Sequence, residues 1–159
     1  MHFDEHGNLA PYVIIELSLP EFQFRFVDGL EDAPHRKNLF EQYLQFVEEL
    51  KTAFEISFFQ WIDGSFVTTK ATPGDLDVVT FLPYDTMNQK INAVFQFREN
   101  AKSMFSVDAK FCPVCKWNHR FYADYKEQEN YWAMLYGFSR RDAEGKKWPK
   151  GIVKIDFQL

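Results

Sequence analysis

Asp75 and Asp77 are the residues of this sequence whose type and spacing best suit chemistry. Asp77 lies in the apolar run 76–82, which has the composition of a buried strand. Side chains two positions apart on a strand share a face, so we expect the carboxylates about 6–7 Å apart along the backbone. Such a pair must repel, take up a proton or share a cation, and Mg²⁺ commonly binds carboxylates together with substrate phosphates. The spacing therefore predicts a site for Mg²⁺ or Mn²⁺.

The same residues allow a plainer interpretation. Pro73, Gly74 and Asp75 have the composition of a polar turn that leads into the strand. Asp77 favours the metal site, because an unpaired charge inside an apolar run costs free energy.

A Gly-Ser pair precedes the aspartates. Gly64 and Ser65 follow a second expected strand, 58–62. Gly64 permits a positive φ angle or the close approach of a ligand. The Ser65 hydroxyl, beside exposed backbone N–H groups, is suited to phosphate. Lys70 lies between this pair and the aspartates and could reach a phosphate, although an exposed lysine on a connecting turn needs no function.

The string Gly64-Ser65-x9-Asp75-x-Asp77 resembles the signature of the polymerase-β-like nucleotidyltransferase superfamily. The resemblance implies that the Gly-Ser pair holds the β- and γ-phosphates of a nucleoside triphosphate. It also implies that Asp75, Asp77 and a third carboxylate from a later strand bind two Mg²⁺ ions. The string 61–79 also resembles a group of bacterial nucleotidyltransferase-like proteins, and this similarity covers most of the chain.

Asp108 is the expected third carboxylate. In the run 105–114, alternation places Asp108 and Lys110 on one face of a strand and apolar residues on the other. The residues between, 86–103, have helical spacing, and a strand-helix-strand order brings 105–114 beside the strand of Asp77. A surface aspartate on an edge strand is the alternative.

The fold class expected from these patterns is α+β, with a mixed β-sheet flanked by helices. The resemblance implies a minimal nucleotidyltransferase-like fold. Apolar residues at three- and four-residue steps predict helices over 35–53, 86–103 and 124–137. We expect residues 1–34 to form an N-terminal arm with extended segments, because Phe22, Phe24 and Phe26 occupy alternate positions. Residues 118–159 are expected to form a helix, a basic loop and a strand, 152–157.

Length and charge bound these predictions. The 159 residues suit one domain, 1–159. A net charge of −5 gives no general attraction for nucleic acid.

Arg36 and Lys37, near the start of the first expected helix, are interpreted as solvated charges. Basic residues gather after position 139 and could hold a triphosphate or RNA or form a solvated loop: Arg140, Arg141, Lys146, Lys147, Lys150 and Lys154.

Cys112, Cys115 and His119 have the spacing of half a zinc site. Structural zinc usually takes four ligands from two such pairs, and the sequence has no second pair, so two reduced thiols are the preferred interpretation.

The chain lacks an apolar run of about 18 residues and a signal-like N-terminus. We therefore expect a cytoplasmic protein with no membrane partner.

The function expected is transfer of a nucleoside monophosphate from a nucleoside triphosphate to a hydroxyl on a protein or RNA. By resemblance, the acceptor could be a cognate toxin or a defence protein. The alternative is an inactive nucleotidyltransferase-like scaffold that acts by binding a protein, since the high aromatic content permits an exposed apolar interface.

Overall fold

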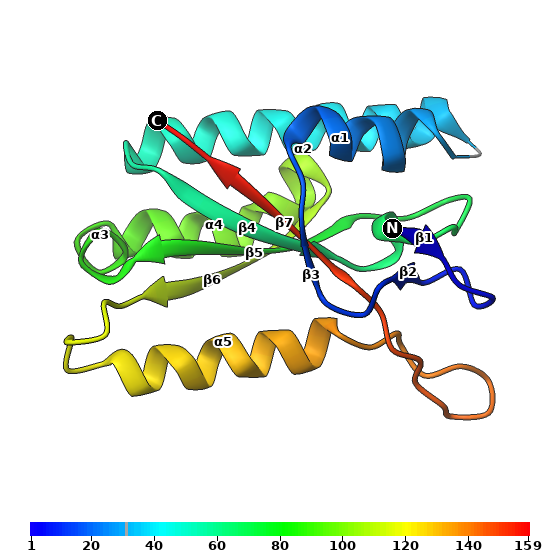
Figure 1. Cartoon of the computed structure of the whole chain (residues 1–159). Coiled ribbons are helices and arrows are strands. Elements are labelled where there is room, and N and C mark those ends of the chain that lie inside the picture. The colour runs from blue at the N-terminus through cyan, green and yellow to red at the C-terminus, as the bar shows by residue number, and fades with distance from the viewer. Residues whose placement is uncertain (31) are drawn as a thin grey trace.

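In the computed structural model, which describes residues 1–30 and 32–159, a five-stranded mixed sheet forms the centre of the fold (Figure 1). The β3/β7 and β5/β6 pairs are parallel, and the other two pairs are antiparallel. These strands confirm the ones expected from the sequence in the central and C-terminal parts of the chain. Across the sheet the order is β3 (Ile14–Glu16), β7 (Ile152–Phe157), β4 (Phe58–Asp63), β5 (Leu76–Pro83) and β6 (Val107–Val114).

Helices cover both faces of this sheet (Figure 1). One face packs against α2 (Ala33–Phe54) and α4 (Ile91–Phe105) through residues such as Ile62 and Val78. We call it the closed face. The other packs against α5 (Tyr122–Tyr136) through residues such as Trp61 and Val79, and we call it the α5 face. The predicted α+β class, a mixed sheet flanked by helices, is confirmed.

The closed face contains a buried polar network. Tyr43 on α2 donates its hydroxyl hydrogen to Gln60 Oε1 at 2.7 Å, and Gln60 Nε2 donates to Thr80 Oγ1 at 2.9 Å. All three residues are fully buried. Because each partner is satisfied, the network links α2 to β4 and β5 without leaving these groups unpaired.

The prediction of extended segments near Phe22 was wrong. The chain forms α1 (Leu19–Gln23) and then a π-helical turn, η1 (Phe24–Asp28). Ser18 and Glu21 form a capping box that starts α1. Phe22 and Phe26 are fully buried, whereas Phe24 is 69% exposed, which is the four-residue period of a helix. Upstream, β1 (His2–Phe3) and β2 (Leu9–Ala10) form a small antiparallel hairpin.

The expected helix over 86–103 is two helices, α3 (Tyr84–Gln89) and α4, divided at Lys90. The Lys90 side chain bonds to the carbonyl of Ala53 at 2.7 Å and to Glu55 at 3.2 Å, which fixes this break against the end of α2. In the residues that the structure describes, helices are too short or too polar to cross a membrane.

Candidate functional site

A cleft of about 640 Å³ opens on the α5 face, where β4 ends and β5 begins. Five of the residues expected from the sequence to form a site line it: Gly64, Ser65, Lys70, Asp75 and Asp77. The other lining residues come from every part of the chain: Asn8, Asp63, Thr68, Gly74, Lys102, Leu135, Tyr136, Phe138, Ser139, Arg140, Lys147 and Lys150. The fold therefore gathers segments that are distant in sequence into one concave surface.

Three aspartates form a row across the sheet, and two of them, Asp63 and Asp77, line the cleft. In the strand register, Asp63 of β4 is opposite Asp77 of β5, and Asp77 is opposite Asp108 of β6. Register partners on neighbouring strands project from the same face of a sheet, with their strands about 4.8 Å apart. Asp108 lies beside Asp77 as expected, although it does not line the cleft itself.

Asp75 and Asp108 each form an ion pair with a lysine. Lys102 Nζ lies 2.8 Å from Asp75 Oδ2, and Lys110 Nζ lies 2.6 Å from Asp108 Oδ1. Within residues 1–30 and 32–159, Asp77 has no such ion pair. In the same residues, no three His, Cys, Asp or Glu side chains converge closely enough to hold a metal ion. Two of the three expected metal ligands thus face lysines in this conformation.

Asp63 was not expected at this site, and it forms a buried ion pair with Lys150 at 2.8 Å. Burial raises the pKa of Asp63 to about 6, and it outweighs the attraction of the lysine. The pKa of Asp77 is also raised, first by burial and then by repulsion from Asp75 and Asp108. The floor of the cleft therefore holds more negative charge than the chain alone stabilises.

Gly64 approaches Asp77 so closely that a side chain would not fit. A Cβ atom at this position would lie 1.8 Å from Asp77 Oδ2, and the φ angle of Gly64 is +78°. Both facts require glycine. Ser65 then begins a short 3₁₀ turn, η2 (Ser65–Val67), so the Gly-Ser pair and Asp77 are neighbours in space.

Arg36 holds the loop that follows Ser65, and the interpretation of Arg36 as a solvated charge was wrong. Its side chain is fully buried. Nη1 donates to the carbonyls of Phe26 and Phe66 at 2.9 and 2.8 Å. Nη2 donates to the carbonyls of Thr68 and Lys70 at 3.0 and 2.5 Å. Several carbonyls can satisfy a guanidinium without a carboxylate, because it carries five N–H donors.

The basic loop, residues 138–150, forms one wall of the cleft. It returns on itself through hydrogen bonds from Ser139 N–H to Trp148 and from Lys150 N–H to Gly137, each at 2.8 Å. Of its basic residues, Arg140, Lys147 and Lys150 line the cleft. Arg141 instead donates to the carbonyl of Gly145 at 2.7 Å, and Lys146 lies over the Trp148 ring. The predicted basic segment is thus divided between the cleft and its own supporting contacts.

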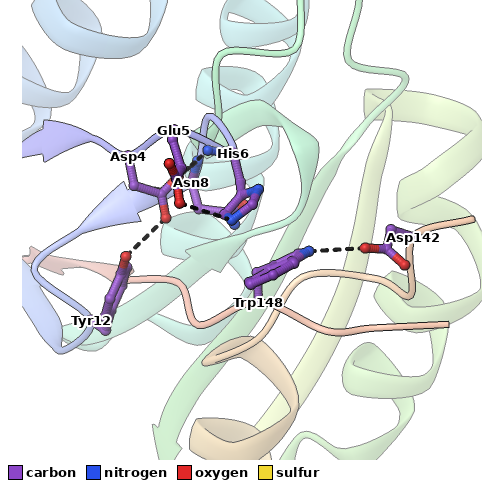
Figure 2. Close-up of polar contacts among 7 residues, drawn as sticks. All are labelled: Asp4, Glu5, His6, Asn8, Tyr12, Asp142 and Trp148. Carbon is purple, nitrogen blue, oxygen red and sulfur yellow. Dashed lines mark hydrogen bonds and ion pairs between the residues drawn. The ribbon is translucent and has the colours of Figure 1, made fainter. Parts of the chain in front are cut away.

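The β1/β2 hairpin supports the basic loop from outside (Figure 2). The ring of His6 stacks on Trp148 with centroids 3.9 Å apart. Trp148 Nε1 donates to Asp142 Oδ2 at 3.0 Å, while Asp4 accepts from the Tyr12 hydroxyl at 2.9 Å. The N-terminal residues therefore hold one wall of the cleft in place.

Cys112 and Cys115 are both free and buried. Burial raises the pKa of the Cys112 thiol to about 12. His119 Nδ1 accepts a hydrogen bond from the Phe121 N–H at 3.1 Å. The two thiols are thus not joined in a disulfide in this structure.

One family matches almost the whole chain. Its description is "Family of unknown function (DUF6932)", and the match covers residues 1–156. The chain belongs to this family. No curated protein and no solved structure matches it. The description of the family assigns no activity, so function is argued below from the site.

The donor groups of the site fit a hard divalent cation. Asp75, Asp77 and Asp108 supply only carboxylate oxygens, the ligands that Mg²⁺ prefers. In the part of the chain that the structure describes, Asp77 has no ion pair, burial and repulsion raise its pKa, and it lines the cleft. Asp75 and Asp108 are only partly buried, so their side chains have room to exchange a lysine for a cation.

Proposed function

We propose that this protein is a Mg²⁺-dependent nucleotidyltransferase that moves a nucleoside monophosphate from a nucleoside triphosphate to a hydroxyl on a protein or RNA. One observation carries the proposal. Gly64, Ser65, Asp75 and Asp77 line a single cleft, and Asp108 lies in register beside Asp77. The volume of about 640 Å³ is within the range of small-molecule sites.

Each part of the cleft has a role in this reaction. Asp75, Asp77 and Asp108 would hold Mg²⁺ or Mn²⁺, and the bound ion would lower the pKa of the acceptor hydroxyl and neutralise charge on the leaving group. The acceptor oxygen bonds to the α-phosphorus, and the bond from that phosphorus to the bridging oxygen breaks. Pyrophosphate leaves, and the hydroxyl proton passes to water.

The basic residues of the cleft support a polyphosphate substrate. Lys70, Lys102, Arg140, Lys147 and Lys150 all line it, although the chain carries a net charge of −5. Cations gathered at one concave site raise the local concentration of an anionic ligand. Gly64 and Ser65 hold the β- and γ-phosphates, and Lys70 extends this contact. We place the reaction in the cytoplasm, with a cognate toxin or a defence protein among the acceptors.

The test uses each α-labelled nucleoside triphosphate with Mg²⁺ or Mn²⁺ and a cell extract that supplies acceptors. We expect label on a protein or RNA with the wild-type chain. Asp75→Ala/Asp77→Ala should reduce labelling at least about 100-fold, because charge contacts to a transition state are worth that much. The matched control is Asp85→Ala/Asp124→Ala, which removes two exposed carboxylates outside the cleft and should label normally.

The alternative is an inactive scaffold that binds a protein. Apolar side chains on α5 beside the cleft favour it, since Tyr131 is 57% and Met134 is 74% exposed. Absence of label with every nucleotide, together with absence of Mg²⁺-nucleotide binding by calorimetry, would favour the scaffold over the enzyme.

A further inference from the structure

Asn8 brings an unpaired amide to the cleft. The residue is 5% exposed and lines the cleft. Its backbone N–H donates to Asp4 Oδ1 at 2.8 Å, and its carbonyl accepts from the Asp4 N–H at 2.9 Å. Within the described ranges, 1–30 and 32–159, its side-chain amide forms no hydrogen bond and is not among the buried unpaired groups, so it keeps access to the solvent of the cleft. A carboxamide that is open to a cleft can donate to and accept from a ligand.

Phe138 and Leu135 bring apolar surface to the same cleft. They are 47% and 44% exposed, and both line it. Phosphates and Mg²⁺ do not pack against apolar surface, whereas the flat face of an aromatic ligand does. The cleft therefore has an apolar wall in addition to its charged floor.

These two features flank one stretch of backbone, the segment 149–151. On one side, Gly151 N–H donates to the carbonyl of Leu9 at 2.7 Å, next to Asn8. On the other side, Phe138 forms an antiparallel bridge with the first residue of the segment. Asn8 and Phe138 thus lie on either side of the backbone that carries Lys150 to the floor of the cleft.

We propose that Asn8 and Phe138 form the nucleobase subsite of this cleft. The inference rests on the proposed function and deepens it. A carboxamide presents a donor beside an acceptor, which is the complement of the edge of a nucleobase. An aromatic ring packs against the face of any base. Asn8 therefore selects the base, and Phe138 supplies contact area that every base shares.

The subsite is built before a ligand arrives. Asp4 fixes the turn before Asn8 by accepting from the His6 and Asn8 N–H groups at 2.9 and 2.8 Å (Figure 2). The His6–Trp148 stack then holds this turn against the basic loop. A binding group held in place in this way loses little conformational entropy when a ligand binds.

The experiment is calorimetry of the full chain with Mg²⁺ and five ligands: ATP, GTP, CTP, UTP and tripolyphosphate, which lacks a base. We expect wild-type protein to prefer one nucleotide about tenfold over the others, as one bidentate base contact allows. Asn8→Ala should remove this preference and leave tripolyphosphate binding unchanged. Asn92→Ala, at an exposed asparagine on α4, is the matched control and should keep the preference.

Phe138→Ala provides an independent test, because this side chain is half exposed and its removal should leave the fold intact. It should weaken all four nucleotides about equally and leave tripolyphosphate unaffected. If either variant weakens tripolyphosphate as much as nucleotides, its role is structural and the subsite is wrong. Wild-type protein that binds nucleotides no more tightly than tripolyphosphate overturns the subsite alone. Protein that binds none of the five ligands overturns both the subsite and the proposed function.

Discussion

On β4, Ile62 points into the closed face and is fully buried, while its neighbour Asp63 points to the α5 face and pairs with a lysine. On β5, Val78 and Asp77 divide in the same way. The closed face has its polar groups satisfied by the Tyr43 network, whereas on the α5 face burial and repulsion from Asp75 and Asp108 raise the pKa of Asp77.

This difference separates stability from chemistry on the same strands. Alternation of side chains lets each strand contribute one residue to the core and the next to the cleft. Burial of apolar area stabilises the fold, whereas the partly buried Asp77 carboxylate, which has no ion pair in the described residues, is a cost that the rest of the fold offsets. Removal of buried apolar groups from the closed face and removal of the Asp77 charge from the α5 face should therefore change stability in opposite directions.

The largest effect on stability should come from the closed face. Ile62→Ala should lower the free energy of unfolding by about 2–4 kcal/mol, because it removes buried methyl groups and leaves a cavity. Urea denaturation followed by circular dichroism measures this change. Ile14→Ala, the same substitution at a residue 41% exposed on the edge strand β3, should cost less than about 1 kcal/mol. Equal losses of stability at both positions would show that burial in the closed face is not the cause of the loss.

Arg36→Met should have the next largest effect, a loss of about 2–3 kcal/mol. The substitution keeps much of the side-chain volume but leaves carbonyls of η1 and of the loop after Ser65 without their donor. Limited proteolysis should show cleavage in residues 65–75 before the rest of the chain. Arg25→Met, at an exposed arginine, is the control. A variant as stable and as resistant as wild type would mean that Arg36 does not hold the loop.

The strands and the main site residues could be predicted because their signals are local. Asp75, Asp77 and Gly64 lie within one short stretch, and alternation alone fixed which face Asp108 would share. The capping box at Ser18 was an equally local signal. The prediction rested on the alternation of phenylalanines and used neither the capping box nor the helical period of Phe22 and Phe26.

The walls of the cleft could not be predicted in the same way. Arg36 binds backbone carbonyls, which every residue has, so its partners leave no pattern in the sequence. Asp63 and Lys150 meet only because β7 pairs with β4, a contact between distant segments. Asn8 reaches the cleft through a short hairpin that has no strong signal of its own.

The smallest expected effect on stability has the opposite sign and comes from the α5 face. Asp77→Asn should raise the free energy of unfolding at neutral pH by about 0.5–1 kcal/mol, as replacement of an unfavourable functional group often does. The same variant should lose nucleotide transfer. Thermal unfolding without divalent cations measures the first effect, and the labelling assay measures the second.

The raised pKa values of Asp77 and Asp63 determine how stability should change with pH. In the folded chain, the pKa of Asp77 is raised, and that of Asp63 is raised to about 6, from a usual value near 3.8. Between the usual and the raised values the folded state binds more protons than the unfolded state, so these two groups should stabilise the wild-type protein as the pH falls from about 7 to about 4. Asp77→Asn removes one of the two groups and should make this dependence shallower. A variant whose melting temperature follows that of wild type at every pH would show that the Asp77 carboxylate carries no electrostatic cost, and the distinction between the two faces would fail.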